Sequence, residues 1–364
     1  MKKIDKGLIK KIATNTVFHL ILIVFAFMVL FPVFWGVSTS LRTFEGIYQV
    51  STDMDAASGN IFHKSVQLFK SLFPPAPIQW HNYVEAWHTG HFSKYFGNSL
   101  FYMITVVAFM LFFSSLGAYA FARLKFPGKE FIFYLFLASL VMPLPTIFIT
   151  IYILLQNFPI YLILIFLILS SLLIFSLGSY RRLFWLALGI LIVAGGSYAV
   201  MAARSPDGPK KLLDLLLTNI NLLNTRTGYI LPQIASGLPY TIFLMRSFFE
   251  EIPVDLEDAA RIDGCSRLGI YFKIILPLSR PILAVTGIFG ALSVWKEFLF
   301  AVVVFSDNSK MPIQTGLLAF QGTYKTQWNF LMAGVIITVI PVIIVYVLLQ
   351  KHIISGLTAG AVKG

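Results

Sequence analysis

The chain has 364 residues, of which 57% are hydrophobic and only 12% are charged. Soluble domains carry about 25% charged residues, so this composition excludes a soluble globular protein and indicates one that crosses a membrane several times. The formal net charge is +12. The Lys and Arg residues stand mostly at the ends of apolar runs, which is the positive-inside distribution and argues against a nucleic-acid-binding patch. The one cysteine, Cys265, excludes a disulfide within the chain.

The basic N-terminus precedes the first apolar run, at residues 17–37. A cleaved signal peptide is the alternative interpretation. The run is longer than a usual signal core, and no clear small-x-small cleavage site follows it. We therefore expect residues 17–37 to form the first transmembrane helix and residues 1–16 to lie in the cytoplasm.

Residues 38–96 mix polar and apolar side chains and are expected to form an external loop. Asp53, Asp55 and several Gly and Pro residues are expected to interrupt any long element there. The aromatic side chains of Trp80 and Trp87 suit anchoring at the membrane interface, and stacking on a sugar is the alternative.

Residues 97–156 are expected to hold two spans, at about 98–121 and 131–155. The later span contains Pro143 and Pro145, which should break or kink a membrane helix. Broken helices often lie beside a transport path, but a packing kink explains the prolines equally well.

Residues 157–218 hold two further apolar runs, at about 160–178 and 183–202. We expect them to form a lipid-facing transmembrane hairpin, and docking of an additional subunit is the alternative. The residues after the hairpin, 210–223, are expected to form an amphipathic helix on the outer membrane surface. Its apolar face would consist of Leu213, Leu216, Leu217 and Ile220.

Residues 219–350 carry the expected remaining spans, at about 229–249, 281–305 and 330–350, and residues 351–364 an expected cytoplasmic tail. Eight spans with both ends in the cytoplasm agree best with the distribution of cations.

Trp295, Lys296 and Glu297 lie deep in the span at 281–305. A charge at the bilayer centre costs about 2.5–3.5 kcal/mol on insertion scales, so such residues usually face a bundle interior or a water-filled cavity. Adjacent residues do not share one helix face, so the two charges need separate partners. A place in the solute pathway and a structural contact remain open alternatives.

The charge-rich segment at 253–281 lies between two of these apolar spans. Asp255 is expected to cap a short helix that Gly264 ends in a left-handed turn. Ser266 would cap a second helix, which we expect to stop before Pro277 because the residue ahead of a proline avoids helical angles. A compact polar element between membrane spans suggests a docking site.

The pattern of this segment resembles the EAA loop of ABC importer membrane subunits, which inserts as a coupling helix into a cleft of the ATP-hydrolysing subunit. The family normally has Glu where Asp258 stands, although Glu257 is adjacent, and Ala where Cys265 stands. A loop that only connects two spans is the alternative. The residues assigned to ATPase coupling by this resemblance are Glu257, Asp258, Ala259, Ala260, Asp263, Gly264, Leu276 and Pro277.

The C-terminal string LTAGAVKG resembles the tail of the maltose-type carbohydrate permeases. In that family the tail reaches the ATPase dimer, which implies contacts from Thr358, Gly360 and Lys363. The string GAYAFARLKFPGK, which begins at Gly117, is also similar to the family. It is not a nucleotide-binding loop, because the chain lacks the full G-x-x-x-x-G-K-[ST] spacing.

The resemblance implies an all-α, polytopic transmembrane helical bundle. Permeases of this type have six spans with a short loop between the third and the fourth, so residues 157–218 look like an inserted hairpin that raises the count to about eight. The implied partners are a second permease subunit, forming a heterodimer, together with an ABC ATPase dimer, an external solute-binding protein and membrane lipid. The resemblance implies no cofactor or metal on this chain, since ATP and Mg²⁺ belong to the ATPase, and it implies a prokaryotic cell membrane.

The implied function is import of a carbohydrate by alternating access, with no catalysis on this chain. A self-contained secondary transporter or channel is the alternative and would use Lys296 and Glu297 for coupling. It would leave the coupling motif unexplained. An intramembrane enzyme would need a nucleophile with its base or a metal cluster, and scattered histidines with one cysteine do not supply either.

Overall fold

The computed structural model describes residues 6–56, 61–74, 76–156, 158–159, 219–322 and 325–359, and these are helical apart from loops and two very short strands. They divide into two compact units. Unit 1 comprises Met1–Leu111, Ser247–Phe298 and Met311–Gly364, and unit 2 comprises Phe112–Arg246 and Leu299–Lys310.

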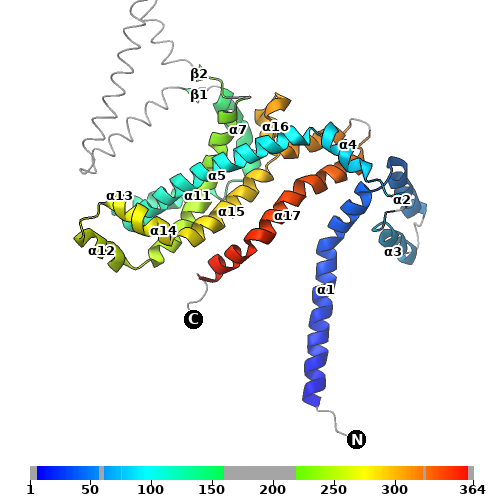
Figure 1. Ribbon diagram of the computed structural model, residues 1–364, viewed down its shortest axis with the longest axis horizontal. Coiled ribbons are helices and arrows are strands. Elements are labelled where there is room, and N and C mark those ends of the chain that lie inside the picture. The colour runs from blue at the N-terminus through cyan, green and yellow to red at the C-terminus, as the bar shows by residue number, and fades with distance from the viewer. Residues whose placement is uncertain are drawn as a thin grey trace, which may run out of the picture. The chain divides into compact units, whose positions relative to one another are not determined.

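Unit 1 is built around α17 (Trp328–Ala359), which packs against α1 (Lys6–Ser40), α4 (His81–Thr89) and α15 (Arg280–Trp295) (Figure 1). Its core joins segments that are far apart in sequence. The remaining unit 1 elements are α2 (Phe44–Ala56), α3 (Ile61–Lys70), the first part of α5 (Phe92–Arg123), α12 (Val254–Ile262), α13 (Arg267–Ile270), η1 (Tyr271–Ile275), α14 (Leu276–Leu278) and η3 (Ile313–Phe320).

Polar contacts fix the packing of α5 on the start of η3 and the residues just before it. Asn98 Nδ2 donates to the Met311 carbonyl oxygen at 3.0 Å, and the Ile313 N–H donates to Ser99 Oγ at 2.7 Å. Phe92 and Ile313 are fully buried in the same hydrophobic cluster. The core of unit 1 therefore depends on contacts between segments more than 200 residues apart in sequence.

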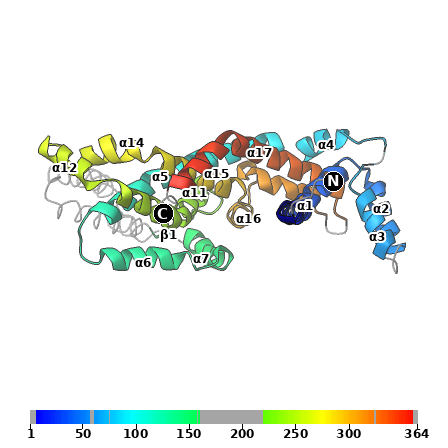
Figure 2. The same cartoon turned by 90° about the horizontal axis from the view of Figure 1, so that it is seen from below.

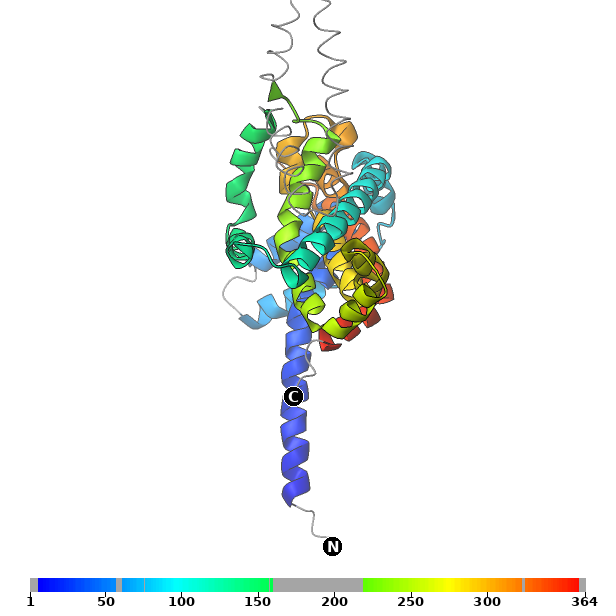
Figure 3. The ribbon, with the colours of Figure 1, turned by 90° about the vertical axis from the view of Figure 1, so that its left-hand side faces the viewer.

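The first helix, α1, exposes its apolar surface along most of its length. None of its most apolar stretch within Asn15–Ser40 is buried, and Figure 3 shows its N-terminal part running free of the other unit 1 helices. Side chains such as Ile23 and Phe25 are more than three-fifths exposed, at 67% and 65%. Such a surface must be covered by lipid or by another subunit.

Unit 2 contains the end of α5, α6 (Lys129–Ser139), α7 (Leu144–Gln156), most of α11 (Arg226–Glu251), α16 (Leu299–Val304) and η2 (Asn308–Lys310). In its aromatic core Tyr229 stacks on Phe300, with ring centroids 5.7 Å apart, and the ring of Phe148 lies tilted against the same Phe300 at 5.5 Å. Two-residue strands, β1 (Phe158–Pro159) and β2 (Asn219–Ile220), pair antiparallel.

In the described part of the chain, three helical segments are long and apolar enough to cross a membrane: Asn15–Ser40, Phe92–Arg123 and Trp328–Leu348. Arg267–Leu278 and Arg280–Trp295 make a fourth if the pair, bent by 75°, is counted as one span. The first, second and last expected spans coincide with the three continuous segments. The total of eight stays a prediction.

Two expected spans are not continuous helices. The span expected at 131–155 consists of α6 and α7, which change direction around Pro143 (Figure 2). The span expected at 281–305 consists of two helices, because α15 ends at Trp295 and α16 begins at Leu299. Proline explains the first break, since it removes an N–H and clashes with the preceding turn.

The expected external loop at 38–96 is more ordered than its composition indicates. It contains α2, α3 and α4, and Asp53 and Asp55 lie inside α2 and do not interrupt it. These three helices are short, with 13, 10 and 9 residues, and α2 ends at Ala56, one residue after Asp55, so the expectation that no long element forms here is not contradicted.

The expected inserted hairpin lies outside the described residues, as do Leu213, Leu216 and Leu217 of the expected amphipathic helix. At the end of that helix the prediction was wrong, because Asn219–Ile220 form β2 and the next residues are not helical. Strand pairing with β1, continued by a hydrogen bond from the Leu222 N–H to the Leu155 carbonyl oxygen at 2.7 Å, holds this backbone extended.

Candidate functional site

Residues 254–278 of unit 1, from α12 to α14, contain the residues predicted to couple to the ATPase and are named the coupling segment for that reason (Figure 1). Its first helix, α12, starts after Pro253, which occupies the N-cap position and has no side-chain acceptor. The expectation that Asp255 caps the helix was wrong. Asp255 lies inside the first turn of α12 together with Glu257. The helix dipole stabilises both carboxylates there, but neither caps the helix.

The end of α12 is a Schellman motif centred on Gly264. Gly264 has φ +79°, and its N–H donates to the Arg261 carbonyl oxygen at 3.0 Å. The Cys265 N–H donates to the Ala260 carbonyl oxygen at 2.9 Å. These are the two bonds that define the motif, and glycine adopts the left-handed angle without the penalty of a Cβ. The predicted left-handed turn at Gly264 is confirmed.

Ser266 caps the next helix, α13, as expected. Its Oγ accepts from the Gly269 N–H at 3.2 Å. The Schellman turn and this cap follow each other directly, so the chain between α12 and α13 has little conformational freedom. The coupling segment is therefore suited to move as one piece.

The predicted coupling residues of α12 lie on two faces. Glu257 and Ala260, three residues apart, face inward and are 1% and 7% exposed. Asp258 and Ala259 are exposed on the other side. Arg261 connects the faces, because Nη1 donates to Asp258 Oδ1 at 2.9 Å and Nη2 lies 3.6 Å from Glu257 Oε2.

Exposed apolar side chains complete the outer surface of the segment. Ile262 is 87% exposed, and Leu256 and Leu268 are 44% and 42% exposed. We did not single out these residues from sequence, although an isoleucine between Arg261 and Asp263 is a usable signal. A short charged helix that ends in an almost fully exposed isoleucine has the character of a protein-docking surface.

The helix after α13 does not stop before Pro277, contrary to expectation. It passes through a π-helical turn, η1, and Pro277 lies inside α14. A proline in a helix clashes with the carbonyl four residues earlier, and π-turns accommodate such insertions. Leu276 is half-buried and Pro277 is exposed. The chain then bends at Ser279, whose Oγ donates to the Ile275 carbonyl oxygen at 2.6 Å.

The three expected pathway residues differ in environment. Trp295 is 3% exposed, and its Nε1 donates to the Thr338 carbonyl oxygen at 3.1 Å, which is a packing role inside unit 1. Lys296 is exposed and Glu297 half-buried, and both lie in the break after α15 and not within a continuous helix. Their place in a solute pathway stays a prediction.

The expected tail contacts lie at the edge of the described chain. The α17 backbone continues to Ala359 and includes Thr358, whereas Gly360 and Lys363 lie outside the described residues. The ATPase contact of these residues stays a prediction.

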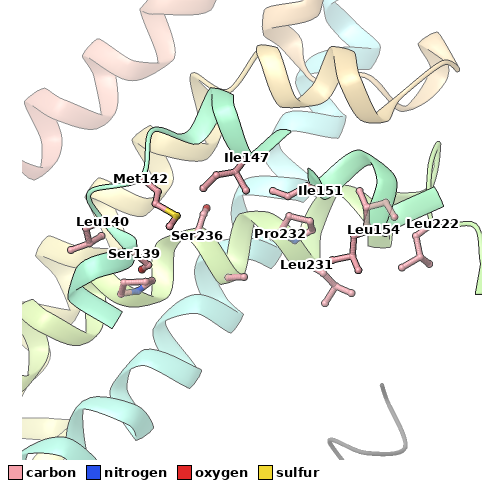
Figure 4. A pocket seen from close by; sticks show the side chains of 13 residues that line it. Ser139, Leu140, Met142, Ile147, Ile151, Leu154, Leu222, Leu231, Pro232 and Ser236 are labelled. Carbon is pink, nitrogen blue, oxygen red and sulfur yellow. The ribbon is translucent and has the colours of Figure 1, made fainter. Parts of the chain in front are cut away.

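Unit 2 contains a pocket of about 500 Å³ between α7, α11 and the linker after α6 (Figure 4). Its lining is hydrocarbon, including Leu140, Ile151 and Leu231. The hydroxyls of Ser139 and Ser236 each donate to a carbonyl of their own helix, at 2.6 and 3.0 Å. The lining includes no charged group, so this pocket suits hydrocarbon and not a sugar. Over the described residues no cluster of His, Cys, Asp and Glu suits a metal ion.

Comparison with known proteins agrees with this geometry. The family model described as "Binding-protein-dependent transport system inner membrane component" matches residues 116–358. The probable ABC transporter permease protein YurM of Bacillus subtilis is 28% identical over 345 residues, covering 94% of this chain and 87% of that protein. The diacetylchitobiose uptake system permease protein NgcG of Streptomyces coelicolor is 26% identical, covering 95% of this chain and 88% of that protein.

A further relative is the arabinooligosaccharides transport system permease protein AraQ of Halalkalibacterium halodurans, 28% identical over 83% of this chain and 88% of that protein. Among solved structures, a bacterial ABC transporter involved in the import of the acidic polysaccharide alginate matches with a TM-score of 0.59 and 20% identity. The match covers 96% of this chain and 99% of that one, and it shows that the two share a fold.

The family match runs from late in α5 to late in α17 and includes the whole coupling segment. Members of this family are transport permeases and not enzymes, and the apolar helices described above make this chain a multi-pass membrane protein. The chain belongs to the family of inner-membrane components of binding-protein-dependent transport systems, as a permease subunit of an ABC importer.

Proposed function

We propose that this permease pairs with a different permease chain and imports a carbohydrate delivered by an external solute-binding protein. The heterodimer and the binding protein are the arrangement that the resemblance to maltose-type permeases implies. The carbohydrate is supported by the printed names of two relatives, one a diacetylchitobiose and the other an arabinooligosaccharide permease.

Energy for transport comes from Mg²⁺-ATP on a pair of separate ATPase subunits, to which the coupling segment docks. The observation that carries this proposal is the outer surface of α12. Asp258 and Ala259 are exposed beside Ile262, whereas Glu257 and Ala260 hold the helix to unit 1. The small side chain of Ala259 allows a partner groove to close tightly on the helix.

The coupling segment continues through η1 and α14 into α15, and few of its backbone dihedral angles are free to change. Closure of the ATPase pair on ATP would therefore displace α12 and α15 together. Differential binding of the ATPases to two permease conformations is what allows the ligand to drive the change.

We propose that both termini and the coupling segment lie in the cytoplasm. Arg261, Arg267, Lys273 and Arg280 give this segment a high density of cations, as the positive-inside rule requires of a cytoplasmic loop. Residues 38–96 are then external.

Purification of the chain from its native membrane in mild detergent tests this proposal. We expect an ABC ATPase pair and a single different permease to copurify, and solute-loaded binding protein to stimulate ATP hydrolysis by the complex. A chain that copurifies only with itself contradicts the proposal, and Lys296 and Glu297 would then be tested as ion-coupling groups of a secondary transporter.

A further inference from the structure

The helix α3 of unit 1 is amphipathic. At 3.6 residues per turn, its apolar side chains fall within an arc of about 160°, and its charged and amide side chains occupy the opposite side. A surface helix with this pattern normally turns its apolar face to the core of its own protein. The apolar face consists of Ile61, Phe62, Val66, Leu68 and Phe69, with Ser65 among them, and the polar face consists of His63, Lys64, Gln67 and Lys70.

The apolar face of α3 is exposed. No residue of the helix is buried, and Ile61 and Phe69 are 85% and 58% exposed. The least exposed residue of α3 is Gln67, at the centre of the polar face. Phe73 extends the apolar surface beyond the helix, because it is exposed and its ring centroid lies 5.5 Å from that of Phe69. The helix therefore turns its polar side toward the rest of the protein and leaves its apolar side for another partner.

Buried hydrogen bonds fix the C-terminal end of α3 to the C-terminal end of α1 (Figure 1). Ser38 Oγ, on α1, donates to the Ser71 carbonyl oxygen at 2.8 Å. Arg42 Nη2 donates to the same oxygen at 3.1 Å and to the Phe73 carbonyl oxygen at 2.8 Å. Ser38, Arg42 and Ser71 are all buried. The position of α3 along the α1 axis is therefore set by the fold.

This junction determines the depth of α3 in a membrane. The mostly exposed run of α1 from Val17 to Phe34 is about 26 Å long, close to the hydrocarbon thickness of about 30 Å. Ser38 follows Phe34 by four residues, or about 6 Å along the helix. The headgroup layer on each side of the hydrocarbon is about 5–8 Å thick. The end of α3 therefore lies at the boundary between acyl chains and headgroups.

The polar groups around α3 suit the same depth. Lys64 and Lys70 are exposed on its polar face, where their ammonium groups can reach lipid phosphates. Trp80 is exposed too, and it starts beside the same end of α1, because the Gln79 N–H donates to the Leu41 carbonyl oxygen at 3.0 Å. Tryptophan is enriched at membrane interfaces. Cations on one face and phenylalanines on the other are typical of helices that lie in the plane of the interface.

We propose that α3 is an interfacial helix that binds the lipid bilayer, with Ile61 and Phe69 among the acyl chains and Lys64 and Lys70 beside the phosphates. It holds the C-terminal end of α1 at a fixed depth through the Ser38–Ser71 junction. The partner is the bilayer and not a protein groove, since the junction places the helix at the membrane surface. The proposal requires only that α1 crosses the bilayer, and it depends on neither the solute nor the ATPase.

Spin labelling tests the proposal on the chain with its copurifying subunits, reconstituted in vesicles of phosphatidylethanolamine and phosphatidylglycerol. Cys265→Ser removes the one thiol of the chain and supplies the background, and Phe69→Cys or His63→Cys then carries a nitroxide. At position 69 we expect collisions with oxygen to exceed those with a water-soluble nickel chelate several-fold, at a depth of about 5–10 Å. His63, exposed on the polar face, is the matched control and should show the reverse order.

Two results of this measurement would overturn the proposal. Collisions at position 69 that are dominated by the nickel chelate would place the apolar face in water. Low collision rates with both reagents would show that a protein surface covers the face.

A photocrosslinker at the same position identifies the partner without a thiol. Replacement of Phe69 by p-benzoylphenylalanine keeps an aromatic side chain at an exposed site, so the helix should fold as before. Illumination in the same vesicles should add the mass of a phospholipid to the chain. The same probe in place of His63 should give several-fold less lipid adduct. An adduct between position 69 and a second permease chain or a solute-binding protein would overturn the proposal and assign this face to protein docking.

Discussion

The coupling segment of unit 1 and the α6–α11 contact of unit 2 both combine an arginine, a carboxylate and apolar side chains. In unit 2 these groups contact one another. Arg246 makes two hydrogen bonds to Glu130, at 2.9 and 3.1 Å, and its guanidinium carbon lies 4.0 Å from the ring centroid of Phe133. In the coupling segment Arg261 binds Asp258 at the surface, and beside them Ile262 is 87% exposed.

The difference indicates what each region is for. Groups that satisfy one another inside a unit stabilise that unit, so changes at Glu130 should affect folding. Groups left at the surface with an exposed isoleucine gain their contacts from another protein, so changes at Ile262 should affect association and transport. Four predictions test this contrast, starting with the largest expected effect.

Replacement of Gly264 by valine should abolish transport. A β-branched residue at φ +79° is strained, so the Schellman turn that fixes α12 against α13 would rearrange. No atom lies within 4 Å of a Cβ built on Gly264, so steric clash is not the cause and the chain should still reach the membrane. Uptake of labelled solute, compared with the amount of chain in the membrane, measures the effect.

Gly264→Asn is the matched control, because asparagine tolerates the left-handed region better than other residues with a side chain. It should retain much of the transport that Gly264→Val loses. Normal uptake by Gly264→Val would contradict a coupling role for this turn.

Ile262→Asp should prevent the ATPase from copurifying. It places a charge where we expect an apolar contact, and a central apolar anchor typically contributes about 2 kcal/mol or more to binding. The melting temperature of the isolated chain should not change, because the side chain contacts little within the chain. Ile262→Leu keeps the apolar surface and should bind the ATPase. Association that survives Ile262→Asp would show that another surface docks.

Glu257→Ala should lower the stability of unit 1. Glu257 is 1% exposed and lies 3.6 Å from Arg261, so the change removes a packed side chain and its ion pair and leaves a cavity, at about 0.5–3 kcal/mol. Thermal unfolding in detergent measures the loss. Asp258→Asn, which weakens only the exposed ion pair, should leave the unfolding temperature nearly unchanged.

Equal effects of the two substitutions on unfolding would show that the inner and outer faces of α12 are not distinct.

Glu130→Gln should have the smallest effect, and it should depend on pH. The hydrogen bond from Arg246 lowers the pKa of Glu130 below its ordinary 4.5. A carboxylate whose pKa is lower in the folded state stabilises that state above the ordinary value, and the stabilisation is lost as pH falls through the lowered pKa. The wild type should therefore lose stability below about pH 4.5, and Glu130→Gln should lose less over the same interval.

Melting curves of both proteins between pH 7 and pH 3 check this prediction. Parallel curves would mean that the Arg246–Glu130 pair contributes nothing measurable, as is common for partly exposed ion pairs.

Local features of the chain could be predicted from sequence because their causes are local. Runs of apolar residues long enough to cross a bilayer mark α1, α5 and α17. The left-handed turn needs only Gly264, and the cap of α13 needs only Ser266. The resemblance to the EAA loop could also be seen in the sequence, because the residues of its pattern lie close together in the chain; their coupling role stays a prediction.

The remaining features depend on tertiary contacts. Sequence did not separate Glu257 from Asp258, since only packing on unit 1 decides which carboxylate is buried. The π-turn before Pro277 overrode a local preference, and the end of α15 at Trp295 coincides with burial of the indole and its bond to Thr338. Arg42 lies within a few residues of an apolar span, and no local pattern predicts that its side chain is buried. Its burial against the end of α3, some thirty residues later in the chain, makes it part of the junction between α1 and α3, because free energy of burial belongs to the folded surroundings and not to the residue itself.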